Sequence, residues 1–254
     1  MSSLSARYDK KKSAMRNGGA LLRRVVDILI PFVQPGVSLI DIDRRATELI
    51  TQEGSEVSFS RVPGYRWATC LSVNQTVVHG VPDQYQLKSE DVLKLDIGVF
   101  HGGFHIDYGD TVVVGGEDAA SKETRRFLDV GRKTLLGALA LVKPGVHIGV
   151  VSEYIGTHIH EAGYKIIYEL TGHAVGVELH MMPYIPGFLQ SSIENTPRFK
   201  PGTAYAIEVI YAQKDDSVVQ KKRDGWSLET KNGSQSGCFE NSVFVDQDKA
   251  YVLV

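Results

Sequence analysis

Two aspartates stand out in KLDIGVFHGGFHIDYGD, residues 94–110, because each lies inside an apolar strand pattern. Asp96 falls in the first run and Asp107 in the second, and the glycines between the runs predict a β-hairpin. Aspartate is a poor strand former, and an unpaired buried carboxylate is costly. With a turn centred near Gly102, the carboxylates are expected within one residue of direct opposition, about 6 Å apart. Such a pair requires a proton or a cation between its members, and a metal ion fits.

Further residues of metal-binding type occur in similar apolar surroundings. TGHAVGVELHMMP places His173 and His180 seven residues apart, and glycines around His173 allow the backbone to approach closely. Glu208 in YAIEVIY and Glu240 in CFENSVFV each interrupt an apolar strand pattern. A single acid of this kind is more often an edge or bulge residue, but four in the same context favour a site. Four carboxylates and one imidazole suit two divalent ions, such as Mn, Fe, Co or Zn.

An internal repeat indicates the elements that must position these side chains. VQPGVSLIDIDRRATELITQEG (33–54) and VKPGVHIGVVSEYIGTHIHEAG (142–163) align without gaps at an offset of 109. Each copy follows an apolar helical pattern, passes through a PGV turn and opens a second helix that ends at a glycine. Two related halves are therefore expected, at about 10–115 and 120–254, each a helix pair followed by strands.

The strand patterns follow the two helix pairs. They are expected at residues 68–82, 92–100, 104–114, 203–213 and 238–245, with turn residues KKRDGW before the last. Helices on one side of antiparallel strands make an α+β architecture. No linker rich in Pro, Ser or Gly divides the halves, so residues 1–254 are expected to form a single catalytic domain.

Composition limits the class of protein. A chain of 254 residues with 43% hydrophobic content can bury a sizeable core. It has no apolar run of about 18 residues and no secretory signal pattern, so a cytoplasmic location without membrane contact is expected. Cys70 and Cys238 follow no zinc spacing and are expected as free thiols. Residues 1–24 hold seven basic residues against one acidic residue, and this basic segment favours a solvated helix face over a contact with RNA or an acidic partner.

The succession SVNQTVVHGVP, KLDIGVFHGGFHID, GHAVGVELHMMP, YAIEVI and KKRDGWSLETKNGSQSGCFENSVFV resembles the methionine aminopeptidases, and specifically their type I branch. These are dinuclear metallopeptidases of the pita-bread (creatinase/aminopeptidase) fold, a pseudo-twofold pair of helix-pair-plus-strands halves around an antiparallel sheet. The resemblance covers the chain from about residue 10 to its end.

The resemblance implies roles for the acidic residues and one histidine. Asp96 would chelate one metal ion, Asp107 and Glu240 would bridge both ions, and His173 and Glu208 would complete the second site. The family implies Co, Mn, Fe or Zn as the metal and hydrolysis by a water that the ions activate. Glu208 would also relay a proton to the leaving amine. The reaction implied is removal of an N-terminal methionine that precedes a small residue.

Two further histidines match substrate-facing positions of the family. His79, in VVHGVP, and His180 would contact the scissile peptide and stabilise the tetrahedral intermediate. Taken alone, His79 would equally suit a core histidine satisfied by backbone. The remaining histidines match no such position and are expected on the surface or in turns: His101, His105, His147, His158 and His160.

The methionine pocket implied by the resemblance is lined by Tyr65, Cys70, Leu179 and Trp226. A soft aromatic and aliphatic lining suits a thioether. Trp67 matches no pocket position, so a packing role is expected for it. The substrates implied are peptides and nascent chains with N-terminal methionine, and the protein is expected to be a monomer. A contact of its basic N-terminal segment with the ribosome is an open alternative to the solvated helix face.

The chain departs from the family pattern near the ligands, and three other classes stay open. Lys94 replaces the usual asparagine, Val209 replaces a proline, and Asn-Ser follows Glu240 in place of His-Thr. An Xaa-Pro aminopeptidase or prolidase shares the fold and the ligands, but usually has an extra N-terminal domain. A non-catalytic binding protein of the same fold would be signalled by a lost ligand, and none is lost. A nucleic-acid-binding module would depend only on the basic first 24 residues.

Overall fold

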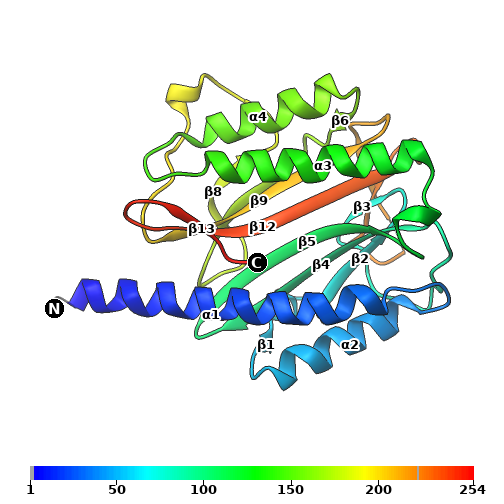
Figure 1. Cartoon of the computed structure of the whole chain (residues 1–254), viewed down its shortest axis with the longest axis horizontal. Coiled ribbons are helices and arrows are strands. Elements are labelled where there is room, and N and C mark those ends of the chain that lie inside the picture. The colour runs from blue at the N-terminus through cyan, green and yellow to red at the C-terminus, as the bar shows by residue number, and fades with distance from the viewer. Residues whose placement is uncertain (1–2, 222) are drawn as a thin grey trace.

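The computed structural model describes residues 3–221 and 223–254, so Lys222 of the expected KKRDGW turn lies outside the described residues. Two helix pairs each precede a group of strands (Figure 1). The elements of the first half are α1 (Ser3–Phe32), α2 (Leu39–Gln52), β1 (Glu56–Val57), β2 (Thr69–Val73), β3 (Thr76–Val78), β4 (Val92–His101) and β5 (Phe104–Val113). The second half comprises α3 (Lys122–Leu141), α4 (Ile148–Glu161), β6 (Lys165–Ile166), β7 (Thr171–Val175), β8 (Met181–Pro186), β9 (Thr203–Ala212), β10 (Val218–Gln220), β11 (Leu228–Thr230), β12 (Ser236–Val245) and β13 (Ala250–Val252).

The repeat predicted from the two PGV turns is confirmed. Gly36 and Gly145 have φ of +88° and +79°, and α2 and α4 begin three residues after each of them. Left-handed backbone of this kind favours glycine, which explains why both copies place it at the same position. The turns bring each second helix back alongside the first, so that α1 lies beside α2 and α3 beside α4.

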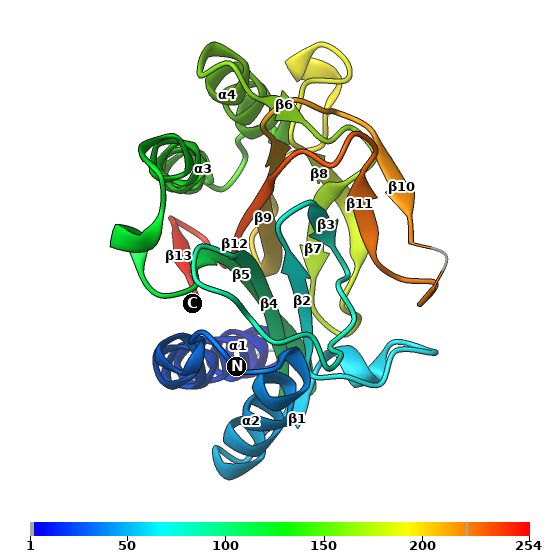
Figure 2. The ribbon, with the colours of Figure 1, turned by 90° about the vertical axis from the view of Figure 1, so that its right-hand side faces the viewer.

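Ten of the described strands form one large antiparallel sheet whose path runs β1-β4-β5-β12-β9-β7-β8, with β2, β6 and β13 paired to β4, β9 and β12. Figure 2 shows the four helices on one side of this sheet, while β10, β11 and β3 form a separate three-stranded sheet on the other side. Aliphatic side chains fill the layer between helices and sheet as two buried clusters, one under each helix pair. The predicted α+β, pita-bread architecture is confirmed. No helix among the described residues is both long enough and apolar enough to span a membrane.

The β4–β5 hairpin differs in register from the sequence-based expectation. His101 pairs with Phe104, so the turn contains only Gly102 and Gly103, with φ of +59° and +93°. Two left-handed residues are typical of the two-residue turns that match strand twist. Since the turn is centred between the glycines, Asp107 opposes Gly98 rather than a residue adjacent to Asp96. The two aspartates are therefore diagonal neighbours, which places both on the same face of the sheet.

Candidate metal centre

One row of paired residues crosses four strands and carries three of the predicted ligands. Asp96 on β4 pairs with Gly109 on β5. Gly109 in turn pairs with Glu240 on β12, and Glu240 pairs with Glu208 on β9. Because paired residues point to the same face of a sheet, the three carboxylates share one face. Gly109 leaves room between them, since a Cβ placed there would lie 3.2 Å from Cβ of Glu240.

The neighbouring row carries the other two predicted ligands. Asp107 on β5 donates its backbone N–H to Oγ of Ser242 on β12 and accepts from the same hydroxyl at its carbonyl. Ser242 pairs with Ala206 on β9, and Ala206 pairs with His173 on β7. Residues two apart on a strand face the same way, so Asp107 and His173 join the face of the first row. All five predicted ligands are thus brought together from both halves of the chain.

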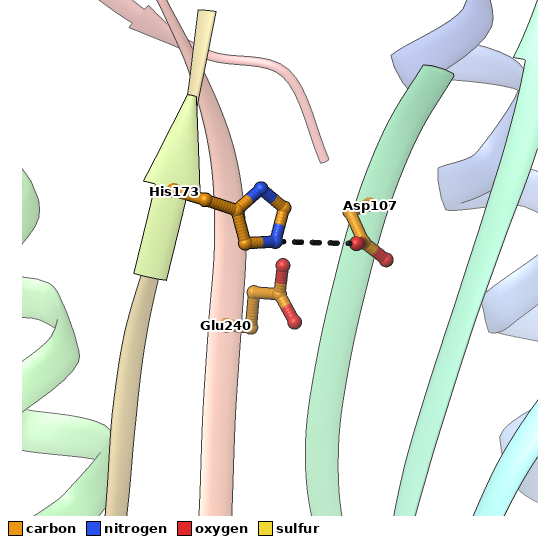
Figure 3. Close-up of side chains that lie close together, drawn as sticks. All are labelled: Asp107, His173 and Glu240. Atoms are coloured by element: carbon orange, nitrogen blue, oxygen red, sulfur yellow. Dashed lines mark ion pairs between the residues drawn. The ribbon is translucent and has the colours of Figure 1, made fainter. Parts of the chain in front are cut away.

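The side chains converge on one point. Ligand atoms of Asp107, His173 and Glu240 lie within 4.8 Å of one another (Figure 3). Nε2 of His173 lies 4.0 Å from Oδ2 of Asp107 and 3.4 Å from Oε1 of Glu208. This spacing leaves a gap that a cation with ligand bonds of about 2 Å would fill.

The carboxylates are buried without the partners that burial normally requires. Oδ1 of Asp96 and Oε1 of Glu240 are buried and have no hydrogen-bond partner among the described residues. Burial, and then the charge of Asp107, raises the pKa of Asp96, Glu208 and Glu240 well above the usual range. Burial also raises the pKa of Asp107 to about 7. Burial and mutual repulsion disfavour the charged form of these carboxylates, and a cation among them would stabilise that form.

His173 is prepared to act as a neutral ligand. Its Nδ1 lies 3.0 Å from the carbonyl oxygen of Ala174, which fixes the proton on Nδ1 and turns the lone pair of Nε2 toward the carboxylates. Burial lowers the pKa of His173 to about 3, so the imidazole is uncharged at neutral pH. Oxygen donors combined with one imidazole fit a divalent first-row metal ion.

A cavity of about 220 Å³ opens beside the ligands. Apolar and aromatic side chains from four segments line it, with two of the metal-site aspartates at its base. The lining residues are Phe59, Val62, Tyr65, Cys70, His79, Asp96, Asp107, Leu179, His180 and Trp226. Each residue predicted to face substrate or to line the methionine pocket is among them. Phe59 and Val62 were not predicted, because nothing in their local pattern separates pocket lining from core.

The aromatic wall of the cavity is held by edge-to-face contacts. The ring of Tyr65 lies 5.1 Å from that of Trp226 at 75°, and 5.1 Å from that of Trp67 at 60°. Trp67 packs behind Tyr65 without lining the cavity, as expected. Cys70 pairs with Asp96 across β2 and β4, which joins the pocket wall to the metal centre.

The two predicted substrate-facing histidines, His79 and His180, both line this cavity. His79 has φ of +56°, an unusual conformation for a non-glycine residue that is typical of functional positions. Burial lowers the pKa of His79 to about 4, and the pKa of His180 is lowered for the same reason. The ring of His180 lies 4.5 Å from that of His173. Both imidazoles are therefore neutral hydrogen-bonding groups beside the ligands.

The expectation that His105 lies on the surface or in a turn is wrong. His105 is 5% exposed and faces the same side of β5 as Asp107, two residues further on. Its Nδ1 lies 2.7 Å from Oγ of Ser58, and burial lowers its pKa to about 4. The alternation in FHID carries this signal, because two residues before an inward aspartate is another inward position. The other four histidines are half-buried or exposed, as expected: His101, His147, His158 and His160.

Lys94 occupies the next inward position before Asp96 and is 2% exposed. Its Nζ donates to the carbonyl oxygen of Asn74 at 2.6 Å. Burial lowers the pKa of Lys94 to about 7. Lys94, which replaces the family's usual asparagine, therefore links β4 to the β2–β3 turn by a hydrogen bond and leaves the predicted ligands in place. Cys70 and Cys238 are buried free thiols, as expected.

Comparison with known proteins agrees with this geometry. The sequence model of metallopeptidase family M24 matches residues 13–247. Methionine aminopeptidase 1 of Bacillus subtilis is 30% identical over 92% of this chain and 92% of that protein. A methionine aminopeptidase structure from Thermotoga maritima has a TM-score of 0.86 and 30% identity, covering 98% of this chain and 96% of that one. A prolidase from Pyrococcus furiosus shares the fold at a TM-score of 0.75 and 17% identity, and the match covers 63% of that chain.

Proposed function

Because the chain belongs to metallopeptidase family M24 and to the methionine aminopeptidases within it, we propose that it removes the N-terminal methionine of peptides and nascent proteins whose second residue is small. The observation that carries this proposal is the position of the apolar cavity. Two residues at its base, Asp96 and Asp107, are also predicted metal ligands. A side chain in the cavity would therefore hold its own peptide bond beside the metal centre.

The metal centre is proposed to hold two divalent ions. Asp96 would chelate one of them, Asp107 and Glu240 would bridge both, and His173 and Glu208 would complete the second site. The buried, unpartnered oxygens of Asp96 and Glu240 support this assignment. When bound, the ions supply Lewis-acid activation of a water at neutral pH. Cobalt, manganese, iron and zinc all suit this donor set.

His79 and His180 are proposed to bind the scissile peptide. Each is neutral and lines the cavity, so each can donate an N–H to a carbonyl oxygen as negative charge develops there. Glu208 is proposed to hold a proton at a carboxylate oxygen and pass it to the leaving amine. Its raised pKa, caused first by burial, favours that role.

The substrate side chain is proposed to occupy the cavity between Tyr65, Cys70, Leu179 and Trp226. A volume of about 220 Å³ accommodates one medium-sized side chain. The thioether of methionine packs favourably on aromatic edges and is flexible enough to fill such a space. A buried apolar pocket discriminates by shape, so the second substrate residue, which lies outside it near the ligands, is expected to be small.

The deciding experiment measures methionine release from Met-Ala-Ser. Metal-stripped protein is resupplied with Co, Mn, Fe or Zn in turn, and Gly-Pro is offered in parallel. Release of methionine that depends on one of the ions supports the proposal. Efficient cleavage of Gly-Pro with poor release of methionine would instead assign an Xaa-Pro peptidase. Binding of the tripeptide without turnover under every metal would assign a non-catalytic relative.

Nascent chains as substrates imply a cytoplasmic, monomeric enzyme that contacts the ribosome through its basic N-terminal helix. Two of the basic side chains already have partners within the molecule. Lys12 pairs with Asp246, and Lys11 donates to the carbonyl oxygen of Gly202. Arg7 and Lys10 are exposed and are the residues proposed for the contact. Unchanged co-sedimentation with ribosomes after Arg7→Gln and Lys10→Gln would contradict it.

A further inference from the structure

A buried carboxylate outside the metal centre lies behind the pocket wall. Asp43, on α2, is 7% exposed. Its Oδ1 accepts three hydrogen bonds: from the backbone N–H of Ala68 at 2.9 Å, from that of Thr69 at 2.9 Å and from Oγ1 of Thr69 at 2.8 Å. All three donors lie at the first residue of β2 or just before it. Oδ1 of Asp43 thus links the start of β2 to α2 through three hydrogen bonds.

The loop at residues 65–69 forms part of the pocket wall, and both of its ends are linked to the hydrogen bonds that Asp43 accepts. The hydroxyl of Tyr65 donates to the carbonyl oxygen of Thr69 at 2.7 Å, which ties the near end of the loop to the strand. Cys70 follows Thr69 directly and lines the cavity with Tyr65. A shift of Thr69 would therefore move two lining residues together.

The hydrogen bonds to the Asp43 carboxylate are expected to be strong. Hydrogen bonds to an ionised carboxylate are roughly twice as strong as neutral ones. Loss of Asp43 would leave two backbone N–H groups and a hydroxyl in a buried position without an acceptor, which is destabilising. The nearest relief is movement of residues 65–68 toward solvent, which would loosen the start of β2, since this segment has no strand or helix of its own.

We propose that Asp43 is a positioning residue for the methionine pocket, fixing Tyr65 and Cys70 through Thr69. Its role in selecting methionine rests on the proposed function, whereas its role in holding the wall does not. Asp43 contacts neither the cavity nor a metal ligand in the interactions described, so it acts through the backbone that it binds.

The internal repeat supplies a matched control. At the offset of 109, Asp43 corresponds to Ser152 on α4, which is 2% exposed. Both positions are buried on the second helix of a pair, but Ser152 has no carboxylate and lies in the other half. Truncation of Ser152 therefore disturbs an equivalent packing site without touching the pocket wall.

The first test measures the rate of alkylation of Cys70 by iodoacetamide in the metal-free protein, with Cys238 as an internal reference. Cys238 is buried in the core and Cys70 is buried at the cavity wall, so a rate that rises at Cys70 alone reports a displaced or loosened wall. Asp43→Ala is expected to raise the rate at Cys70 about tenfold or more, as expected for loss of 1.4 kcal/mol of local stability. The rate at Cys238 should stay within about twofold, and Ser152→Ala should change neither rate.

Two conservative variants complete this test. Asp43→Asn keeps an acceptor oxygen and should restore much of the protection at Cys70. Thr69→Val removes one donor and keeps the side-chain shape, so it serves where Asp43→Ala does not fold. Unchanged labelling of Cys70, or equal acceleration of Cys70 and Cys238, would overturn the proposal, because the effect would then be absent or global.

The second test uses kinetics with Met-Ala-Ser. Asp43→Ala and Thr69→Val should raise KM about threefold to tenfold and reduce the preference for methionine over leucine, with kcat within about threefold of wild type, and Asp43→Asn should stay closer to wild type in both. A fall in kcat with KM and selectivity intact would exclude a role in the pocket. If the wild-type protein releases no methionine, the proposed function fails, and the labelling result still decides whether Asp43 holds the wall.

Discussion

Glu208 and Glu240 lie directly opposite each other on the neighbouring strands β9 and β12, with both side chains on the same face of the sheet. Like charges at such a pair repel, and Glu240 is buried while the side chain of Glu208 is only 11% exposed. Within the described part of the chain, neither pairs with Lys or Arg. Charge compensation must therefore come from protons in the metal-free protein and from cations in the loaded one.

This relationship predicts that the metal-free protein loses stability as the pH rises. The pKa of each buried carboxyl group is raised in the folded state, so its contribution to stability is complete below about pH 4 and is lost through the folded pKa, about 7 for Asp107. The pKa values of His79 and His173 are lowered in the folded state, so these two residues make the folded state less stable as the pH falls below about 6.5.

Measurements between about pH 6.5 and pH 8.5 separate the two effects. Over this range the free energy of unfolding of metal-free protein should fall by about 1–2 kcal/mol for each carboxyl group that ionises. Glu240→Gln should flatten the dependence, and saturating metal should abolish it, because the ions bind the charged form. Thermal melts followed by circular dichroism test this. A midpoint that rises with pH in metal-free protein would contradict it.

Loss of a bridging carboxylate should stop turnover. Asp107→Asn and Glu240→Gln should each lower kcat/KM by about a thousandfold, since an amide leaves two cations with less charge compensation. Metal content measured by atomic emission should fall as well. Asp110→Asn is the control, because Asp110 faces the other side of β5 and already accepts from the backbone N–H of Thr111. Equal losses at Asp107 and Asp110 would be incompatible with the site described.

A different pattern is expected at His79. His79→Ala should lower kcat by about 100-fold, as for loss of a donor to a developing oxyanion. Bound metal should remain close to the wild-type amount, since His79 is not among the residues whose ligand atoms converge. Loss of metal in this variant would reassign His79 as a ligand.

The pocket should select the first residue of the substrate, and the space beside it near the histidines should select the second residue. The ratio of kcat/KM for Met-Ala-Ser over Met-Lys-Ser should be about 100 or more, because a large second residue would clash near the histidines. Trp226→Ala should leave this ratio intact and increase cleavage after leucine or phenylalanine, since it removes the pocket wall against Tyr65. A large change in the second-residue preference of Trp226→Ala would place the indole outside the first-residue pocket.

The acidic residues proposed as ligands could be singled out from the sequence because their carboxylates contrast with the apolar pattern of a central strand. Asp96, Asp107, Glu208 and Glu240 each interrupt such a pattern, and all four lie on strands of the sheet. The helix pairs were predictable because the repeat preserves both the turn glycine and the apolar period. These signals are local and belong to the residues themselves.

The features that the sequence did not reveal depend on backbone geometry or on distant partners. The hairpin register follows from the left-handed backbone of both Gly102 and Gly103, which makes a two-residue turn. This turn shifts the strand pairing by one residue relative to a turn centred at Gly102. Asp43 looks like any helical acid, and its role depends on backbone donors 25 and 26 residues away.

The central position of β12 governs when the protein can become active during its own synthesis. Residues 236–245 insert between β5 and β9, which have no pairing with each other in the sheet. Until this late segment leaves the ribosome, the strands from the two halves expose facing edges, which are prone to association with other chains. The enzyme proposed to trim nascent chains therefore cannot complete its own metal centre until β12, which carries Glu240, has been made.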